Sequence, residues 1–192
     1  MDRFIGREAE IAALNHLLKD RARMAQFVIV YGQRRVGKTT LLLHWAQQTG
    51  QPYLYWVARR ETPEATRQSL ARALWNWAYP GRPDSKPPLF TDWEMLFAEI
   101  ARLIAGKPVI MIWDEFPYAA ESDPSLPSHL QAAWDHLFKE HPVMLILSGS
   151  HIGMMVDMMT YHAPLYGRFT AQFPVDPLPF AQARHFPQLF SG

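Results

Sequence analysis

The sequence predicts one α/β domain built around a parallel β-sheet, and three observations support this. Short, almost wholly apolar runs such as QFVIVY at 26–31 and PVIMIW at 108–113 are typical of strands buried on both faces. Segments with apolar residues at helical spacing alternate with these runs. Of the 192 residues, 48% are hydrophobic and 19% are charged, which is enough for one core.

The predicted elements alternate along the chain. The predicted helices span residues 7–20, 38–48, 62–79, 92–105 and 128–140. The predicted strands span residues 26–31, 53–58, 108–113, 142–147 and, as a fifth, 170–175. Pro63 suits the first turn of its helix, and Asp92 is a start signal for the next one. A proline-rich loop at 80–88 separates these two helices.

Composition excludes several classes of protein. Lys and Arg total 19 against 18 Asp and Glu, for a formal net charge of +1. This balance argues against nucleic-acid binding through bulk positive charge, although a local patch is compatible with it. The absence of cysteine excludes disulfides, thiolate zinc sites and cysteine nucleophiles. No apolar run approaches the roughly 20 residues of a membrane span, and the N-terminus does not resemble a signal peptide, so we expect a cytoplasmic protein.

One motif, GQRRVGKT at 32–39, fits the phosphate-binding pattern G-x-x-x-x-G-K-[ST] and lies between a predicted strand and helix. Its glycines let the backbone curl so that amides face phosphate oxygens. Lys38 would act on the β- and γ-phosphates during both binding and catalysis, and Thr39 would ligate Mg²⁺. The expected nucleotide-binding residues are Gly32, Gln33, Arg34, Arg35, Val36, Gly37, Lys38, Thr39 and Thr40. Arg34 and Arg35 are expected to face solvent, with a neighbour or nucleic acid as the alternative.

A second motif, Asp114-Glu115, follows the predicted strand at 108–113. Ligands of open parallel sheets bind at the carboxyl ends of strands, so Asp114 is predicted to hold Mg²⁺ and Glu115 to act as the base for an attacking water. The alternative is an acidic turn that caps the strand. The long stretch after Lys38 leaves room for a strand between the two motifs, which favours the ATPase division of phosphate-loop proteins. No N-K-x-D motif is present, so ATP is favoured over GTP.

Five segments together resemble the archaeal-type ATPases of the AAA+ superfamily, which are close to the STAND NTPases. They are FIGREAEIAAL, YGQRRVGKT, IWDEFPY, LSGSHIGMM and PLYGRFTAQFPVDPLPF. The resemblance runs from about Phe4 to Phe180. It implies a three-layer P-loop NTPase fold of AAA+ type with a five-stranded parallel sheet.

The resemblance also implies roles for single residues. Ile5 and Gly6 would contact adenine, although an apolar staple before the first helix would look the same. Ser148 or Ser150 would be the polar sensor at the end of the fourth strand, where a turn of small residues is the alternative. Arg168 would be an arginine finger that acts on a neighbouring subunit of a homo-oligomer, or else a surface arginine.

The family pattern ends at residue 180. We therefore expect an ATPase core at 1–180, with 181–192 as the start of a lid helix or a tail, in a piece of a longer protein with a further C-terminal domain. A naturally lidless protein is the alternative. The predicted function is ATP binding and Mg²⁺-dependent hydrolysis coupled to a conformational or assembly change. The alternatives are a slow STAND-like switch in defence or signalling, and the ATPase module of a DNA-handling protein.

Overall fold

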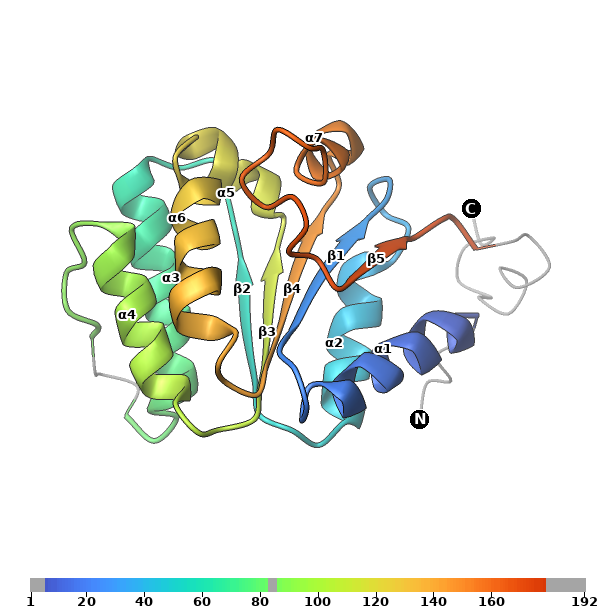
Figure 1. The fold of residues 1–192 in the computed structure, drawn as a ribbon, viewed down its shortest axis with the longest axis horizontal. Coiled ribbons are helices and arrows are strands. Elements are labelled where there is room, and N and C mark those ends of the chain that lie inside the picture. Colours follow the sequence, from blue (N-terminus) through green and yellow to red (C-terminus); the bar gives the residue numbers. More distant parts are fainter. Residues whose placement is uncertain (1–5, 83–85, 179–192) are drawn as a thin grey trace, which may run out of the picture.

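Three layers make up the protein in the computed structural model, which describes residues 6–82 and 86–178 (Figure 1). The middle layer is a five-stranded sheet in which every pairing is parallel. Its strands are β1 (Gln26–Tyr31), β2 (Tyr53–Val57), β3 (Val109–Asp114), β4 (Val143–Gly149) and β5 (Ala171–Pro174). Their spatial order is β2-β3-β4-β1-β5, so β4 separates the phosphate-loop strand from the acidic strand, as predicted.

Helices cover both faces of this sheet, with α1 and α2 on one side and α3, α4 and α6 on the other (Figure 1). They are α1 (Glu8–Asp20), α2 (Lys38–Gln48), α3 (Pro63–Ala78), α4 (Trp93–Ile104), α5 (Phe116–Ser122), α6 (Leu126–Ala133), the π-helix η1 (Trp134–Phe138) and α7 (Ile152–Asp157). The Thr62 and Asp92 side chains accept hydrogen bonds from the first turns of α3 and α4. Both helices therefore start where the sequence predicts.

Two apolar cores lie on opposite faces of the sheet. One includes Trp113, Phe97 and Phe138 and packs under α3 to α6, and the other includes Trp45 and Ile112 under α1 and α2. Every residue of β3 and β4 is buried. Burial on both faces explains why these strands are continuous apolar runs in the sequence.

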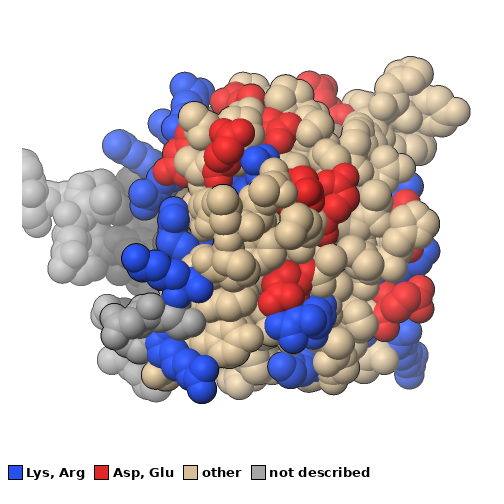
Figure 2. All heavy atoms as spheres, turned by 90° about the vertical axis from the view of Figure 1, so that its left-hand side faces the viewer, with Lys and Arg blue, Asp and Glu red and all other residues tan. Residues whose placement is uncertain are grey.

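The surface over α3, α4 and α6 carries no continuous charge of one sign. Figure 2 shows its middle as mostly uncharged, with Lys and Arg around the left, lower and right edges and Asp and Glu mostly in the upper half. This face agrees with the near-zero net charge of the chain. Among the described residues, no helix is both long and apolar enough to cross a membrane.

The structure corrects the sequence prediction at three helices. The predicted helix at 128–140 is an α-helix that begins at Leu126, followed by the π-turn 134–138, in which the Lys139 N–H donates to the Trp134 carbonyl. Two short helices, α5 and α7, were not predicted; each begins where a buried strand ends. Residues 181–192, expected to start a lid helix or a tail, lie outside the described residues.

Candidate nucleotide-binding site

The loop after β1 has the backbone geometry that its glycines predict. Gly37 has φ +91° and Arg35 φ +66°, both in the left-handed region, and α2 begins directly at Lys38. Gly32 is needed for a different reason, because a Cβ there would lie 2.2 Å from the Val175 carbonyl oxygen. The loop therefore curls over the N-terminus of α2, where helix amides and the helix dipole favour an anion.

Lys38 links this loop to the end of β4. The residue is almost fully buried, and its ammonium donates to the carbonyl oxygens of Gly32 at 2.8 Å and Gln33 at 2.9 Å, and to Ser150 Oγ at 3.0 Å. Burial lowers the pKa of Lys38, while the carboxylates of Glu115 and Asp114 act in the opposite direction. The amine thus lies between the carbonyls of the loop and Ser150 at the end of β4.

Asp114, at the end of β3, is fixed by three hydrogen bonds. Its Oδ2 accepts from Thr39 Oγ1 at 2.5 Å and from the Tyr55 hydroxyl at 3.2 Å, and its Oδ1 accepts from the Glu115 N–H at 3.0 Å. Burial, reinforced by the charge of Asp114, raises the pKa of Tyr55, so this phenol stays protonated and continues to donate. Sequence reasoning missed Tyr55, because only the strand order places β2 beside β3.

Glu115 lies in the left-handed region, with φ +51°, and turns back toward β4. Its Oε1 accepts from the Ser150 hydroxyl at 2.5 Å, and its Oε2 accepts from the Ser150 N–H at 3.2 Å. Ser148, by contrast, is fully buried, and its hydroxyl has no hydrogen-bond partner among the described residues. Of the two candidate sensors, Ser150 is therefore the one in contact with the predicted catalytic groups.

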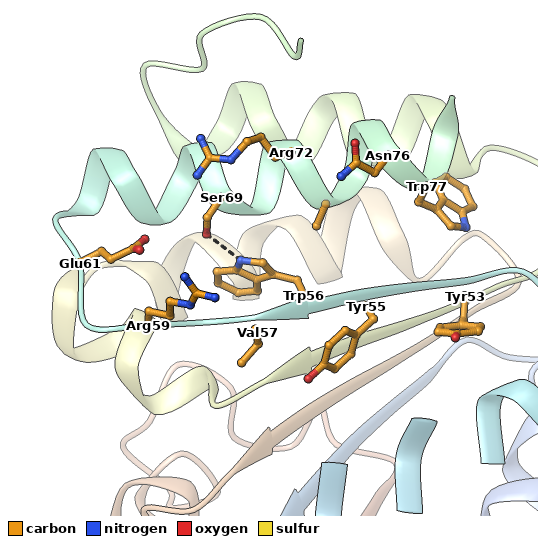
Figure 3. Close-up of a pocket in the computed structure, with 11 residues that line it drawn as sticks. Tyr53, Tyr55, Trp56, Val57, Arg59, Glu61, Ser69, Arg72, Asn76 and Trp77 are labelled. Carbon is orange, nitrogen blue, oxygen red and sulfur yellow. Dashed lines mark hydrogen bonds between the residues drawn. The ribbon is translucent and has the colours of Figure 1, made fainter. Parts of the chain in front are cut away.

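One cavity of about 450 Å³ unites the two motifs. It is lined by Arg34, Arg35, Gly37, Lys38, Thr39, Thr40, Glu115 and Ser150, all of which were predicted from the sequence. Arg34 and Arg35 are exposed, and Arg34 also donates to the Tyr118 hydroxyl on α5, a contact that the sequence did not indicate. A second pocket, of about 590 Å³, lies at the outer edge of β2 against α3 and contains none of the predicted site residues (Figure 3).

Few protein oxygens of the described residues are available as metal ligands in this cavity. Such a site suits Mg²⁺, which is bound partly by nucleotide phosphates and water, better than a metal bound by protein side chains alone. Within residues 6–82 and 86–178, no group of three or more His, Asp or Glu side chains is arranged for a metal. Thr39 Oγ1 donates a hydrogen bond to Asp114 Oδ2 at 2.5 Å, so the two oxygens predicted to hold Mg²⁺ lie side by side.

The N-terminal motif reaches the loop through a residue that was not predicted. The Arg7 guanidinium is almost fully buried and donates to the Val36 carbonyl at 2.8 Å and the Asp176 carbonyl at 2.6 Å. Gly6 has φ +87°, whereas Ile5 lies outside the described residues. The expected adenine contacts of Gly6 and Ile5 remain predictions.

Arg168 is bound within its own chain. Its guanidinium contacts both carboxylate oxygens of Asp135, the closest at 2.6 Å, and donates to the carbonyls of Pro164 and Tyr166 at 3.0 Å. The sequence did not indicate Asp135 as a partner. The role of Arg168 as a finger toward another subunit stays a prediction, and such a role would require these contacts to break.

Solved structures with this fold include two proteins of low sequence identity. The Walker-type ATPase paby2304 of Pyrococcus abyssi is 22% identical, with a TM-score of 0.60 over 94% of this chain and 55% of that chain. The ORC1 protein of Aeropyrum pernix, solved in complex with DNA, is 18% identical, with a TM-score of 0.65 over 98% of this chain and 50% of that chain. Both support the fold alone.

Comparison of the sequence with known proteins shows the family of the chain in addition to its fold. The uncharacterized protein MJECL04 of Methanocaldococcus jannaschii is 31% identical over 184 residues, which are 95% of this chain but 38% of that protein. The chain thus spans well under half of this curated relative. Residues 4–191 match the family model described as an ATPase domain predominantly from Archaea. Because this match spans almost the whole chain, the chain belongs to the family of ATPase domains found predominantly in Archaea.

Proposed function

We propose that this chain binds ATP with Mg²⁺ and hydrolyses its terminal phosphoanhydride bond. One observation carries the proposal: Ser150 joins Lys38 to Glu115 in the cavity that the phosphate loop lines. A phosphate-binding cation and a carboxylate that can activate water are thereby held on the two sides of a single hydroxyl. Family membership supports the same reaction class.

Binding would rest on the loop and the start of α2. The backbone amides of the loop and the Lys38 ammonium would hold the β- and γ-phosphates. Thr39 Oγ1 and Asp114 Oδ2 would hold Mg²⁺, and Tyr55 would keep the Asp114 carboxylate in place. When bound, Mg²⁺ supplies positive charge against the charge that develops on the phosphate oxygens.

Glu115 would orient the attacking water and accept its proton as the water oxygen bonds to the γ-phosphorus and the bond to ADP breaks. Ser150 positions this carboxylate from both of its oxygens. Lys38 would stabilise the charge on the departing phosphate. The products are ADP and inorganic phosphate.

A second candidate is a nucleotide-gated switch that hydrolyses ATP rarely. The contact of Arg168 with Asp135 favours it, because an arginine held by its own chain supplies no charge to a neighbouring subunit. Multiple-turnover kinetics separate the two candidates. Continuous turnover supports the enzyme, whereas near-stoichiometric hydrolysis with a nucleotide-dependent change in assembly supports the switch.

The decisive experiment compares Glu115→Gln with wild type for ATP binding and turnover. We expect unchanged binding and a loss of turnover of about 100-fold or more. Lys38→Ala should lose binding itself. Glu140→Gln, an exposed site at the opposite end of β4, is the matched control and should behave as wild type. Wild-type turnover by Glu115→Gln would refute the mechanism.

A further inference from the structure

A separate pocket of about 520 Å³ adjoins the nucleotide cavity on the side of β2. It is lined by Arg34, Ala58, Arg59, Arg60, Tyr118, Ser150 and His151. Two of these residues, Arg34 and Ser150, also line the nucleotide cavity. Because Ser150 contacts both Lys38 and Glu115, the two spaces meet where the γ-phosphate of a bound nucleotide would lie.

Positive charge dominates the lining of this pocket. It contains three arginines and neither Asp nor Glu. Arg59 is exposed and has no hydrogen-bond or ion-pair partner within the described part of the chain. Arg60 makes one ion pair, at 3.5 Å with Glu121, through a side chain that is 74% exposed, so solvent screens that pair strongly.

Tyr118 holds two of the arginines at the pocket. Its hydroxyl accepts a hydrogen bond from the Arg34 guanidinium. Its ring lies beneath the Arg60 guanidinium, 5.1 Å from ring centroid to Cζ. One aromatic side chain on α5 thus brings a guanidinium from the phosphate loop and one from the end of β2 to the same space.

The remaining polar group, His151, presents a donor in its neutral form. Its Nδ1 accepts the Met154 N–H at 3.2 Å, which leaves the proton on Nε2. Guanidinium, phenol and imidazole donors with no acidic lining match an anion with several oxygens. Arginine in particular binds phosphate through two parallel hydrogen bonds.

We propose that this pocket is a second anion site, which takes a phosphate group next to the γ-phosphate position. Its placement beside a nucleotide rests on the proposed function, whereas its affinity for phosphate does not. The volume admits a phosphomonoester as well as free phosphate. The phosphate group therefore comes either from the ATP just hydrolysed or from a second, small phosphorylated ligand.

A matched control arginine lies close by. Arg72 on α3 is exposed and, like Arg59, has no partner among the described residues. It lines the pocket at the outer edge of β2, where Figure 3 shows it on α3 and Arg59 near the end of the strand, and it does not line the anion pocket. Replacing Arg72 by alanine tests whether the loss of any unpaired arginine on this side of the molecule is enough to weaken phosphate binding.

The test is calorimetric titration of the Lys38→Ala chain with inorganic phosphate and, separately, with O-phosphoserine. The Lys38→Ala background removes the affinity of the phosphate loop itself, and wild type saturated with ADP and Mg²⁺ provides a second measurement. We expect phosphate binding to persist in both. Adding Arg59→Ala and Arg60→Ala together should weaken it at least tenfold, whereas Arg72→Ala should leave it within twofold.

Each outcome is decisive. No phosphate binding in either background overturns the proposal, as does undiminished binding after loss of Arg59 and Arg60. O-phosphoserine binding at least tenfold tighter than phosphate assigns the site to a second ligand; phosphate binding as tight or tighter assigns it to the released product. Both arginines are exposed, and the single Arg59→Ala variant serves if the double variant is unstable. Failure of ATP turnover would refute the proposed function without altering these titrations.

Discussion

Ser150 binds both carboxylate oxygens of Glu115, one through its hydroxyl at 2.5 Å and the other through its N–H at 3.2 Å. The same hydroxyl accepts from Lys38 at 3.0 Å. The orientation of the predicted base, Glu115, is therefore set by the residue that also contacts Lys38, the predicted phosphate-binding lysine.

Replacing Ser150 by alanine should slow ATP turnover about tenfold or more while ATP affinity changes little, because Glu115 loses its orienting hydroxyl. Steady-state kinetics and a separate ATP titration measure the two effects. Ser148→Ala is the control, since that hydroxyl is buried and unpaired among the described residues, and we expect turnover near wild type. A larger loss of turnover from Ser148→Ala than from Ser150→Ala would show that Ser148, and not Ser150, is the sensor.

Thr39→Ala should raise the Mg²⁺ concentration needed for half-maximal turnover by about tenfold, because one of two oxygen donors is lost. Thr39→Ser keeps the hydroxyl and should retain the wild-type dependence. Turnover measured across a Mg²⁺ titration distinguishes them. Identical Mg²⁺ curves for the two variants would remove Thr39 from the metal site.

Gly149→Ala should lower the free energy of unfolding by about 1–3 kcal/mol. A Cβ at this position would lie 2.6 Å from the Pro117 ring and 2.7 Å from the Met155 sulfur, so α5 or α7 must shift. Denaturant unfolding gives the value. Gly81→Ala, where a Cβ meets nothing within 4 Å among the described residues, should not lower the free energy of unfolding, and an equal loss there would argue against the steric explanation.

Arg168→Ala and Asp135→Ala should each lower the free energy of unfolding by about 1 kcal/mol, because each removes the same bidentate ion pair. Because Arg168 also donates to the carbonyls of Pro164 and Tyr166, the double variant should lose little more than Arg168→Ala alone, which a thermodynamic cycle measures. A variant of Arg168 that keeps full stability but loses turnover only in assembled protein would instead support a finger acting on a neighbour.

Tyr55 should make stability fall at alkaline pH. Burial and Asp114 raise the pKa of Tyr55 in the folded chain, so the folded state keeps a proton that the unfolded state releases above about pH 10. Its contribution is complete below that pH and declines as the pH rises. Unfolding measured from about pH 8 to about pH 11 should show a shallower decline for Tyr55→Phe than for wild type. Tyr161→Phe, at an exposed position, should keep the wild-type slope.

The strands were predictable because burial on both faces leaves a direct mark on composition, as in β3 and β4. The short helices were not. Seven residues of α5 and six of α7 contain too few turns for a hydrophobic period to emerge. The π-turn at 134–138 was not predictable for another reason. A single turn with hydrogen bonds to the fifth preceding residue produces no distinct periodicity of apolar residues in the sequence.

The residues of the candidate site also divide into those that the sequence predicts and those that it does not. Residues that act from one continuous motif, such as Lys38 and Thr39, were predicted, because their spacing is the signal. Tyr55 and Arg7 were missed, since their contacts depend on which segments become neighbours in the folded sheet. The choice between Ser148 and Ser150 depends on where β4 ends, at Gly149, and that boundary is a property of the backbone.

The strand order also affects how the chain folds while it is being synthesised. The phosphate-loop strand β1 has only β4 and β5 as neighbours, and its register pairs Gln26 with Met144 and Val28 with Ala171. On the ribosome, β1 therefore emerges long before either partner exists, and the backbone N–H and C=O groups along its edges stay unpaired until residues 143–174 have been synthesised. Shielding of residues 26–31 during translation, by a chaperone or by rapid elongation, would decide how much of the protein folds and how much aggregates.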